Sequence, residues 1–313
     1  MWAILSLEKD EQMGLAHIPV LLNEVLQYLH PEGGVFIDAT FGAGGYTRAI
    51  LKAHPKNKVI AFDRDPMVQK NAEKMKKEFK DRFAFIQECF GHLADFITEP
   101  VDGIVMDIGV SSMQIDTPER GFSLRFNGPL DMRMSDSGPT AADLIKSLPE
   151  SELANILYKY GEERQSRKIA HALKEHLPQT TGEMSEIIHH VMPRPKDGSD
   201  SATRSFQALR IAVNDELGEL ERALQSAPKL LKPNGRLVVV SFHSLEDRIV
   251  KEFFATHSAK VAHKNKYALT EPVEGILRLL TKKPVIALSE ELTQNPRAHS
   301  AKLRAAERTE VSL

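Results

Sequence analysis

Three acidic side chains mark the first third of the chain as a possible binding site. Asp38, Asp63 and Asp107 each fall at or near the end of a short apolar run. Such runs are typical of buried strands, and parallel strands end along one edge of a sheet. We therefore expect the three carboxylates to gather at that edge. There they would repel a pyrophosphate and attract a ligand that carries positive charge.

A glycine-rich turn follows the first of these runs. The segment 36–46 reads FIDATFGAGGY, in which Gly42, Gly44 and Gly45 would let a ligand approach the backbone closely. About 20 residues later the second run ends in Asp63, whose carboxylate can accept hydrogen bonds from ribose hydroxyls. This combination predicts a pocket for a nucleoside-type cofactor.

Two cofactor classes share such a turn. Dinucleotide enzymes usually carry Gly-x-Gly-x-x-Gly with the pyrophosphate at a helix N-terminus, whereas this chain has Gly42-x-Gly44-Gly45. S-adenosyl-L-methionine has no phosphate, and its ammonium and sulfonium suit the three acids. We therefore expect S-adenosyl-L-methionine. The alternatives are a nicotinamide oxidoreductase on the same sheet, or a buried cap at Asp38 beside a simple tight turn.

The elements that would position these residues alternate between strand and helix. Helical patterns at 20–29, 46–53 and 66–79 lie before and between the first strands, which predicts right-handed βαβ units, a parallel sheet and an α/β fold. Apolar runs bounded by turn signals predict strands at 35–39, 59–62, 83–86, 103–108 and 236–242, with a late pair at 276–280 and 285–288.

A long helical stretch interrupts the alternation after residue 115. Ser147-x-x-Glu150 and Thr180-x-x-Glu183 read as capping boxes that open helices. Further helices are expected over 162–177 and, as one long element, over 203–231. We interpret residues 116–200 as a helical subdomain inserted into the sheet domain, with a hinge at 198–201.

Composition limits the class of protein. The 313 residues carry a net charge of −2 and a single cysteine, Cys89, so no intrachain disulfide is possible and a reducing, cytoplasmic setting is expected. No stretch has the length and hydropathy of a membrane helix. Residues 1–12 do not resemble a signal peptide, and Met13 is a possible alternative start. The segment from residue 229 onward contains 15 Lys and Arg residues and 9 Asp and Glu residues, and this excess of positive charge favours an anionic partner.

Long motifs distributed over most of the chain resemble one family. The motifs are DATFGAGGY at 38–46, MDIGVSSMQID at 106–116, GPLDMRM at 128–134, YGEER at 160–164, ATRSFQALRIAVNDEL at 202–217, SFHSLEDRIVK at 241–251 and NPRAHSAKLRAAER at 295–308. Through them the sequence is similar to the bacterial RsmH (MraW) family of S-adenosyl-L-methionine-dependent methyltransferases, which modify N4 of a cytidine in the decoding region of small-subunit (16S) ribosomal RNA.

The resemblance implies a class I, Rossmann-like methyltransferase sheet with an inserted helical subdomain. Residues 17–115 and 201–313 would form the domain that binds S-adenosyl-L-methionine, residues 1–16 a tail, and residues 116–200 the RNA-recognition part. The cofactor-binding residues that it implies, together with those expected from the pattern, are Asp38, Gly42, Gly44, Gly45, Tyr46, Asp63, Phe90, Asp107 and Gln114. Tyr46 stands where the family usually has histidine, so only its backbone is expected to contact the cofactor.

Asp107, or a backbone carbonyl beside it, is the expected catalytic proton acceptor for the target amine. Ser111, Ser112 and His243 are candidates for contact with the substrate, although serines often cap helices and a histidine here is often structural. Candidates for contact with the RNA backbone are Arg297, Lys302, Arg304 and Arg308.

The expected partner is small-subunit ribosomal RNA or the 30S subunit, without a membrane, and the protein would be a monomer or a homodimer. No metal site is expected, because the pair His189-His190 has no cysteine or suitably spaced carboxylate nearby.

Overall fold

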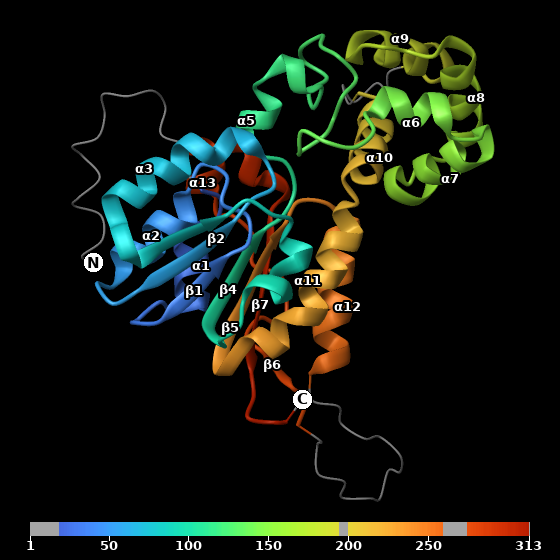
Figure 1. Cartoon of the computed structure of the whole chain (residues 1–313). Helices are drawn as coiled ribbons and strands as arrows, with labels where there is room; N and C mark the ends of the chain where they lie inside the picture. The colour runs from blue at the N-terminus through green and yellow to red at the C-terminus, as the bar shows by residue number, and fades with distance from the viewer. Residues whose placement is uncertain (1–18, 194–199, 259–273, 313) are drawn as a thin grey trace, which may run out of the picture.

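A seven-stranded sheet forms the centre of the molecule in the computed structural model, which describes residues 19–193, 200–258 and 274–312 (Figure 1). The expected tail at 1–16 and half of the expected hinge, residues 198 and 199, lie outside these ranges. In chain order the strands are β1 (Val35–Asp38), β2 (Lys58–Phe62), β3 (Phe83–Ile86), β4 (Val101–Asp107), β5 (Leu231–Ser241), β6 (Leu277–Leu279) and β7 (Lys302–Arg308).

The strand order is β3-β2-β1-β4-β5-β7-β6, and β1 to β5 run parallel while β7 is antiparallel to both of its neighbours. The chain moves outward from β1 to β3 and then returns to place β4 on the other side of β1. Open α/β sheets form a crevice outside the strand ends at such a reversal. The predicted α/β class with a Rossmann-like sheet is confirmed.

Helices cover both faces of the sheet because each strand is apolar on both sides. Phe36 of β1 packs in a cluster with α1 (Leu22–Leu29), α2 (Gly45–Ala53) and α3 (Gln69–Phe79). Its neighbour Ile37 points the other way, into a cluster with α4, α11 and α12. Figure 1 shows α1 to α3 on one side of the sheet and α11 and α12 on the other. The second group has the bounds α4 (Leu93–Phe96), α11 (Glu216–Leu230) and α12 (Ser244–His257).

A helical lobe with its own hydrophobic core stands beside the sheet (Figure 1). Its core includes Ala202, Phe206 and Leu209, so it extends past residue 200, where we expected the insertion to end. The lobe consists of α6 (Ala141–Ser147), α7 (Glu150–Gly161), α8 (Ser166–His176), α9 (Thr181–Val191) and α10 (Thr203–Asn214).

The predicted long helix over 203–231 is wrong, because Asp215 breaks it. Asp215 adopts a left-handed conformation with φ 49°, so α10 ends at Asn214 and α11 begins at Glu216. The capping box at Thr180 and Glu183 is confirmed. The one at Ser147 and Glu150 is wrong, since Ser147 is the last residue of α6 and its hydroxyl donates to the Asp143 carbonyl.

The end of the sheet differs from the prediction. The strand at 276–280 is confirmed as β6, but 285–288 contributes only an isolated bridge between Val285 and Leu303. The apolar pattern did not predict β7, because Lys302, Arg304 and Arg308 give a charged sequence to a strand that is buried on both faces.

Shorter elements are α5 (Ser112–Ile115), α13 (Ser289–Gln294), η1 (Pro66–Val68), η2 (Lys80–Arg82), η3 (Phe90–His92), η4 (Pro118–Arg120) and η5 (Pro296–Ser300). Among the described helices, none combines the length and the apolar character that a membrane crossing requires.

Candidate active site

A cavity of about 410 Å³ opens at the carboxyl ends of β1, β2, β4 and β5, where the strand order reverses. It brings together many residues that the sequence singled out. The predicted residues on its wall are Gly42, Gly45, Tyr46, Asp63, Phe90, Asp107, Ser111, Ser112, Gln114, His243 and Arg297.

Asp63 ties the glycine turn to the end of β2. Its Oδ2 accepts a hydrogen bond of 2.7 Å from the Gly42 backbone N–H, and Oδ1 accepts one of 2.9 Å from Asp65. Gly42 has φ 52°, a conformation that favours glycine. Burial raises the pKa of Asp63 to about 6, although the two backbone donors oppose that shift. Asp63 also lines the cavity.

Asp38 lies under the turn and off the cavity wall. It is fully buried, and its Oδ2 accepts hydrogen bonds from the Thr47 hydroxyl at 2.7 Å and the Thr47 N–H at 3.1 Å. Oδ1 accepts from the Thr40 N–H at 3.2 Å. Burial raises its pKa to about 6. The structure therefore favours the alternative in which Asp38 is a buried cap that shapes the loop without touching the cofactor.

Gly44 also lies behind the wall. Its φ is 82°, and an added Cβ would stand 2.7 Å from the Met75 side chain, so its role is to let the loop pack on α3. Gly45 and Tyr46 reach the wall as the first residues of α2. The Tyr46 hydroxyl donates to the Val20 carbonyl, so it is already used within the protein.

Asp107 is the carboxylate that lacks partners. Its Oδ1 is buried without a hydrogen bond to any described residue, and only its backbone N–H is fixed, by the Thr40 hydroxyl at 2.7 Å. Burial, with the nearby charges of Asp38 and Glu246, holds the pKa of Asp107 well above its usual range. An orphaned acceptor of this kind on a cavity wall fits a ligand that brings a donor or a positive charge.

Gln114 holds the wall together. Its Oε1 accepts from the Ser111 N–H at 2.9 Å, and its Nε2 donates to Asp65 Oδ2 at 2.7 Å. Ser111 caps α5 in return, so the capping role expected as an alternative for this serine is present. Arg120 donates to the other oxygen of Asp65 at 3.0 Å. Because Gln114 is engaged on both amide atoms, it acts by positioning α5.

Two residues that hold the cavity wall in place were not identified from the sequence. Asp65 is 1% exposed and caps the helical turn that begins at Pro66, a signal that the Asp-Pro pair contains. Asn214 is 2% exposed and binds the loop beneath α10: it donates to the Met132 carbonyl at 2.7 Å and accepts from the Met134 N–H at 2.7 Å. No local pattern marks Asn214, because its partners are about 80 residues away.

His243 stands at the cavity rim as the N-cap of α12. Its Nδ1 accepts from the Glu246 N–H at 3.4 Å, and Glu246 Oε2 accepts from the backbone N–H groups of Phe242 and His243. Although burial opposes ionisation, contacts with His243 and Arg210 lower the pKa of Glu246. His243 is thus held in place by Glu246, whose Oε1 lies 3.1 Å from its Nε2, and it also lines the cavity.

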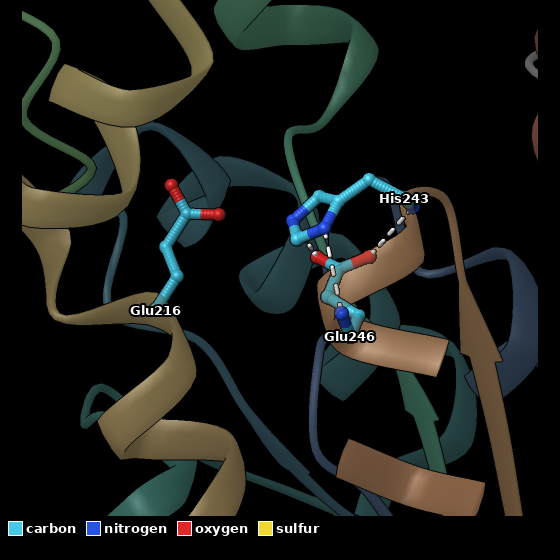
Figure 2. Close-up of side chains that lie close together, drawn as sticks. All are labelled: Glu216, His243 and Glu246. Carbon is cyan, nitrogen blue, oxygen red and sulfur yellow. Dashed lines mark hydrogen bonds and ion pairs between the residues drawn. The ribbon is translucent and has the colours of Figure 1, made fainter. Parts of the chain in front are cut away.

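Glu216 lies opposite this pair (Figure 2), and one ligand atom from each of Glu216, His243 and Glu246 falls within 4.8 Å of the others. Both oxygens of Glu216, however, accept from the Arg210 guanidinium, at 2.8 and 3.0 Å. A metal ion would have to displace that guanidinium. We assign the cluster to the joint between α10, α11 and α12.

The expected RNA-backbone cluster is not a surface patch. Arg304 is 9% exposed and its guanidinium binds Asp247 at 2.6 and 3.2 Å, with Lys302 Nζ at 3.6 Å from the same carboxylate. Arg308 is 8% exposed and donates to the carbonyls of Pro228 and Thr309. Only Arg297 lies at the cavity, paired with Asp116 at 3.0 Å. Lys302, Arg304 and Arg308 lie at alternate positions of β7 and share the face that packs on α11 and α12, whereas Arg297 precedes the strand in η5.

Cys89 lies on the cavity wall beside Phe90, and burial raises the pKa of its thiol to about 11. Other wall residues that no sequence motif indicated include Pro19, Val20, Arg64, Glu88, Met113, Met134, Gln207 and Arg210.

Comparison with known proteins gives a consistent result. The sequence model of the MraW methylase family matches residues 14–309. The "Ribosomal RNA small subunit methyltransferase H" of Granulibacter bethesdensis is 54% identical, with 93% of this chain and 91% of that protein covered. The protein of the same name from Paramagnetospirillum magneticum is 51% identical, with 94% and 96% covered. Among solved structures, an rRNA methylase from Streptococcus thermophilus matches with a TM-score of 0.41 at 11% identity, covering 92% of this chain and 94% of that one.

Replacing Arg304 tests whether it is structural. Arg304→Gln leaves the Asp247 carboxylate without its bidentate partner, and we expect the free energy of unfolding to fall by about 3 kcal/mol in urea titrations. Arg48→Gln, which removes a pair with Glu78 whose side chains are 39% and 43% exposed, should cost less than about 1 kcal/mol. If the Arg304→Gln variant were as stable as the wild type but bound RNA weakly, Arg304 would instead be a residue that contacts RNA.

Proposed function

The chain belongs to the MraW methylase family, and on that premise we propose that it transfers a methyl group from S-adenosyl-L-methionine to N4 of a cytidine in the decoding region of small-subunit (16S) ribosomal RNA. The observation that carries the proposal is the orphaned Asp107 carboxylate on the wall of the cavity at the sheet's point of reversal. The partner follows from the reaction: small-subunit RNA or the 30S subunit, in the cytoplasm.

The residues of the cavity suit this cofactor. Asp63 offers free lone pairs to ribose hydroxyls, and the backbone at Gly42 and Gly45 leaves room for close approach. Phe90, on the wall beyond β3, is placed to pack against an adenine ring. The shared acidity of Asp38, Asp63 and Asp107 is the stronger argument, because each carboxyl has a raised pKa that a cationic ligand would lower.

The bound cofactor supplies an electrophilic methyl group on a positively charged sulfur. The protein's task is to make the cytidine amine a nucleophile, since its lone pair is delocalised into the ring. Asp107 Oδ1 would accept a hydrogen bond from N4 and then take its proton as the N–C bond forms. The positive charge in the loaded cavity favours the ionised Asp107 that this step requires.

The target base must leave its stack to reach this depth. Ser111, Ser112 and His243 line the cavity and are the candidates to hold it. The helical lobe stands beside the sheet (Figure 1), and Gln207 and Arg210 of its α10 line the same cavity, so RNA would enter between the lobe and the sheet edge. Residues 116–200, with the α10 segment that completes their core, form the proposed recognition part.

Proton release should accompany cofactor binding. Asp38 and Asp63 have pKa values of about 6, and a cationic ligand prefers their ionised forms. Affinity for S-adenosyl-L-methionine should therefore fall, by up to about tenfold per pH unit for each group, as the pH drops below 6, and level off above it. Calorimetry in buffers of different ionisation enthalpy would detect the released protons. Asp63→Asn should weaken this dependence; an unchanged pH profile in that variant would exclude Asp63 as a contributor.

Removal of the carboxylate charge at Asp107 tests the chemistry. Asp107→Asn should lower the single-turnover rate of methyl transfer about 10²- to 10⁴-fold, because no group then takes the N4 proton. Thermal melting should show an intact fold, and Asp95→Asn, an exposed change on α4, should keep the wild-type rate. Retained turnover in Asp107→Asn would remove this residue from the mechanism.

The substrate is tested in cells. Small-subunit RNA from a strain lacking the gene should carry one fewer methyl group on a cytidine of the decoding region, as measured by mass spectrometry of nuclease fragments. The purified protein should restore that methyl on isolated subunits. An identical modification pattern in the two strains would contradict the proposed substrate.

A further inference from the structure

A second cavity, of about 830 Å³, lies between the helical lobe and α12. Its walls come from three parts of the chain: the end of α7 with the loop after it, the start of α10 and the first turns of α12. Its charged residues are mostly basic, namely Lys159, Arg164, Arg204 and Arg248, with Glu162 as the single carboxylate. None of these residues belongs to the site described above.

The cations in this cleft are poorly neutralised. Arg248 lies 3.2 Å from Glu162, and more than half of each of these two side chains is exposed. Within the described ranges, Lys159, Arg164 and Arg204 form no ion pair with a carboxylate, and all three are exposed. Grouping like charges around a concave surface is unfavourable unless an anion is bound, so the cleft attracts a polyanion.

An aromatic side chain completes the cleft. Tyr158 is 65% exposed on its wall, so its ring is accessible to a ligand. Exposed aromatic rings among cations are the features that bind single-stranded nucleic acid: bases stack on the ring while phosphates contact the cations. Duplex RNA offers no free base faces for such stacking.

The cleft and the reaction cavity are both lined by α10. Arg204 lines the cleft, whereas Gln207 and Arg210 line the cavity, and the spacing of three residues places them along one face of α10. From Arg204 to Arg210 the helix rises ~9 Å, about the length of two or three stacked nucleotides. The side chain of Gln207 is fixed between the two by a 3.1 Å hydrogen bond to the Tyr160 carbonyl.

We propose that this cleft binds the single-stranded RNA next to the target nucleotide, with phosphates on Arg204, Arg248 and Arg164 and a base stacked on Tyr158. The proposal rests on the proposed function, since it places the strand that leads into the reaction cavity. Binding would exchange the exposed contact between Arg248 and Glu162 for a phosphate. The cleft would therefore hold the flanking strand in register while the target base is turned into the cavity.

The test measures RNA affinity across a salt series with a labelled single-stranded RNA oligonucleotide. The double variant Arg204→Ala/Arg248→Ala should raise the Kd at least about tenfold and reduce the slope of log K against log salt by about 1.4, or 0.7 for each lost cation. Tyr158→Ala should weaken binding about tenfold without changing that slope, and Tyr158→Phe should restore it. Glu162→Gln should tighten binding, because it removes a competing anion.

The matched control is Lys74→Ala/Lys77→Ala on α3, which removes two exposed cations from the other end of the molecule (Figure 1) and should leave both the Kd and the slope unchanged. Equal affinities and slopes for the cleft variants and this control would overturn the proposal. A preference for duplex RNA that Tyr158→Ala does not alter would also overturn it.

The outcome is separable from that of the proposed function. Affinity for S-adenosyl-L-methionine, measured by calorimetry, should be the same in every cleft variant, because none of the substituted residues lines the reaction cavity. If the wild type methylates small subunits and the cleft variants bind RNA normally, the cleft proposal fails and the function stands. If the wild type methylates no ribosomal RNA, the proposed function fails, while the RNA measurements still decide the cleft.

Discussion

The structure depends on burying three carboxylates at the edge of a parallel sheet, none of them in an ion pair with a cation of the described residues. Asp38 holds the glycine loop from below, Asp63 holds it from β2, and Asp107 ends β4 with one oxygen left over. Desolvation disfavours ionisation of all three carboxyls, as their raised pKa values show. A positively charged methyl donor that enters the site favours the ionised forms of these carboxyls and so offsets part of this cost.

The sequence predicted those parts of the fold that depend on local pattern. The first five strands, the glycine turn and the carboxylates at the strand ends follow from periodicity and from the rule that parallel strands end together. Where tertiary contacts outweigh local preference, the prediction failed. Asp215 looks like a helix residue, but the joint of α10 and α11 requires a left-handed turn there. The charged β7 pattern suggests a surface, yet Asp247 and backbone carbonyls supply the partners that make burial possible.

The candidate site divides in the same way. Residues that a sequence motif identified as functional, such as Asp63 and Asp107, lie on the cavity wall. Residues that hold the wall in place through partners remote in sequence were missed. Asn214 fastens a loop from about 80 residues away. Gln114 lines the cavity, as expected of a ligand-binding residue, and it also binds Asp65, a contact that the local sequence does not show. Sequence motifs therefore identify the acidic residues of the site, but they do not identify the residues that hold the cavity wall in place.

The position of β7 has a consequence for how the protein is made. β5 ends at Ser241, and its antiparallel partner begins at Lys302, with β6 placed outside that partner. At about 5–20 residues per second, a ribosome needs several seconds to synthesise the intervening segment. During that interval the growing chain presents an apolar sheet edge at Val238 and Val240, open to pairing with any other strand. Biosynthesis thus contains a vulnerable stage, at which a chaperone that shields hydrophobic edges would have the greatest effect on yield.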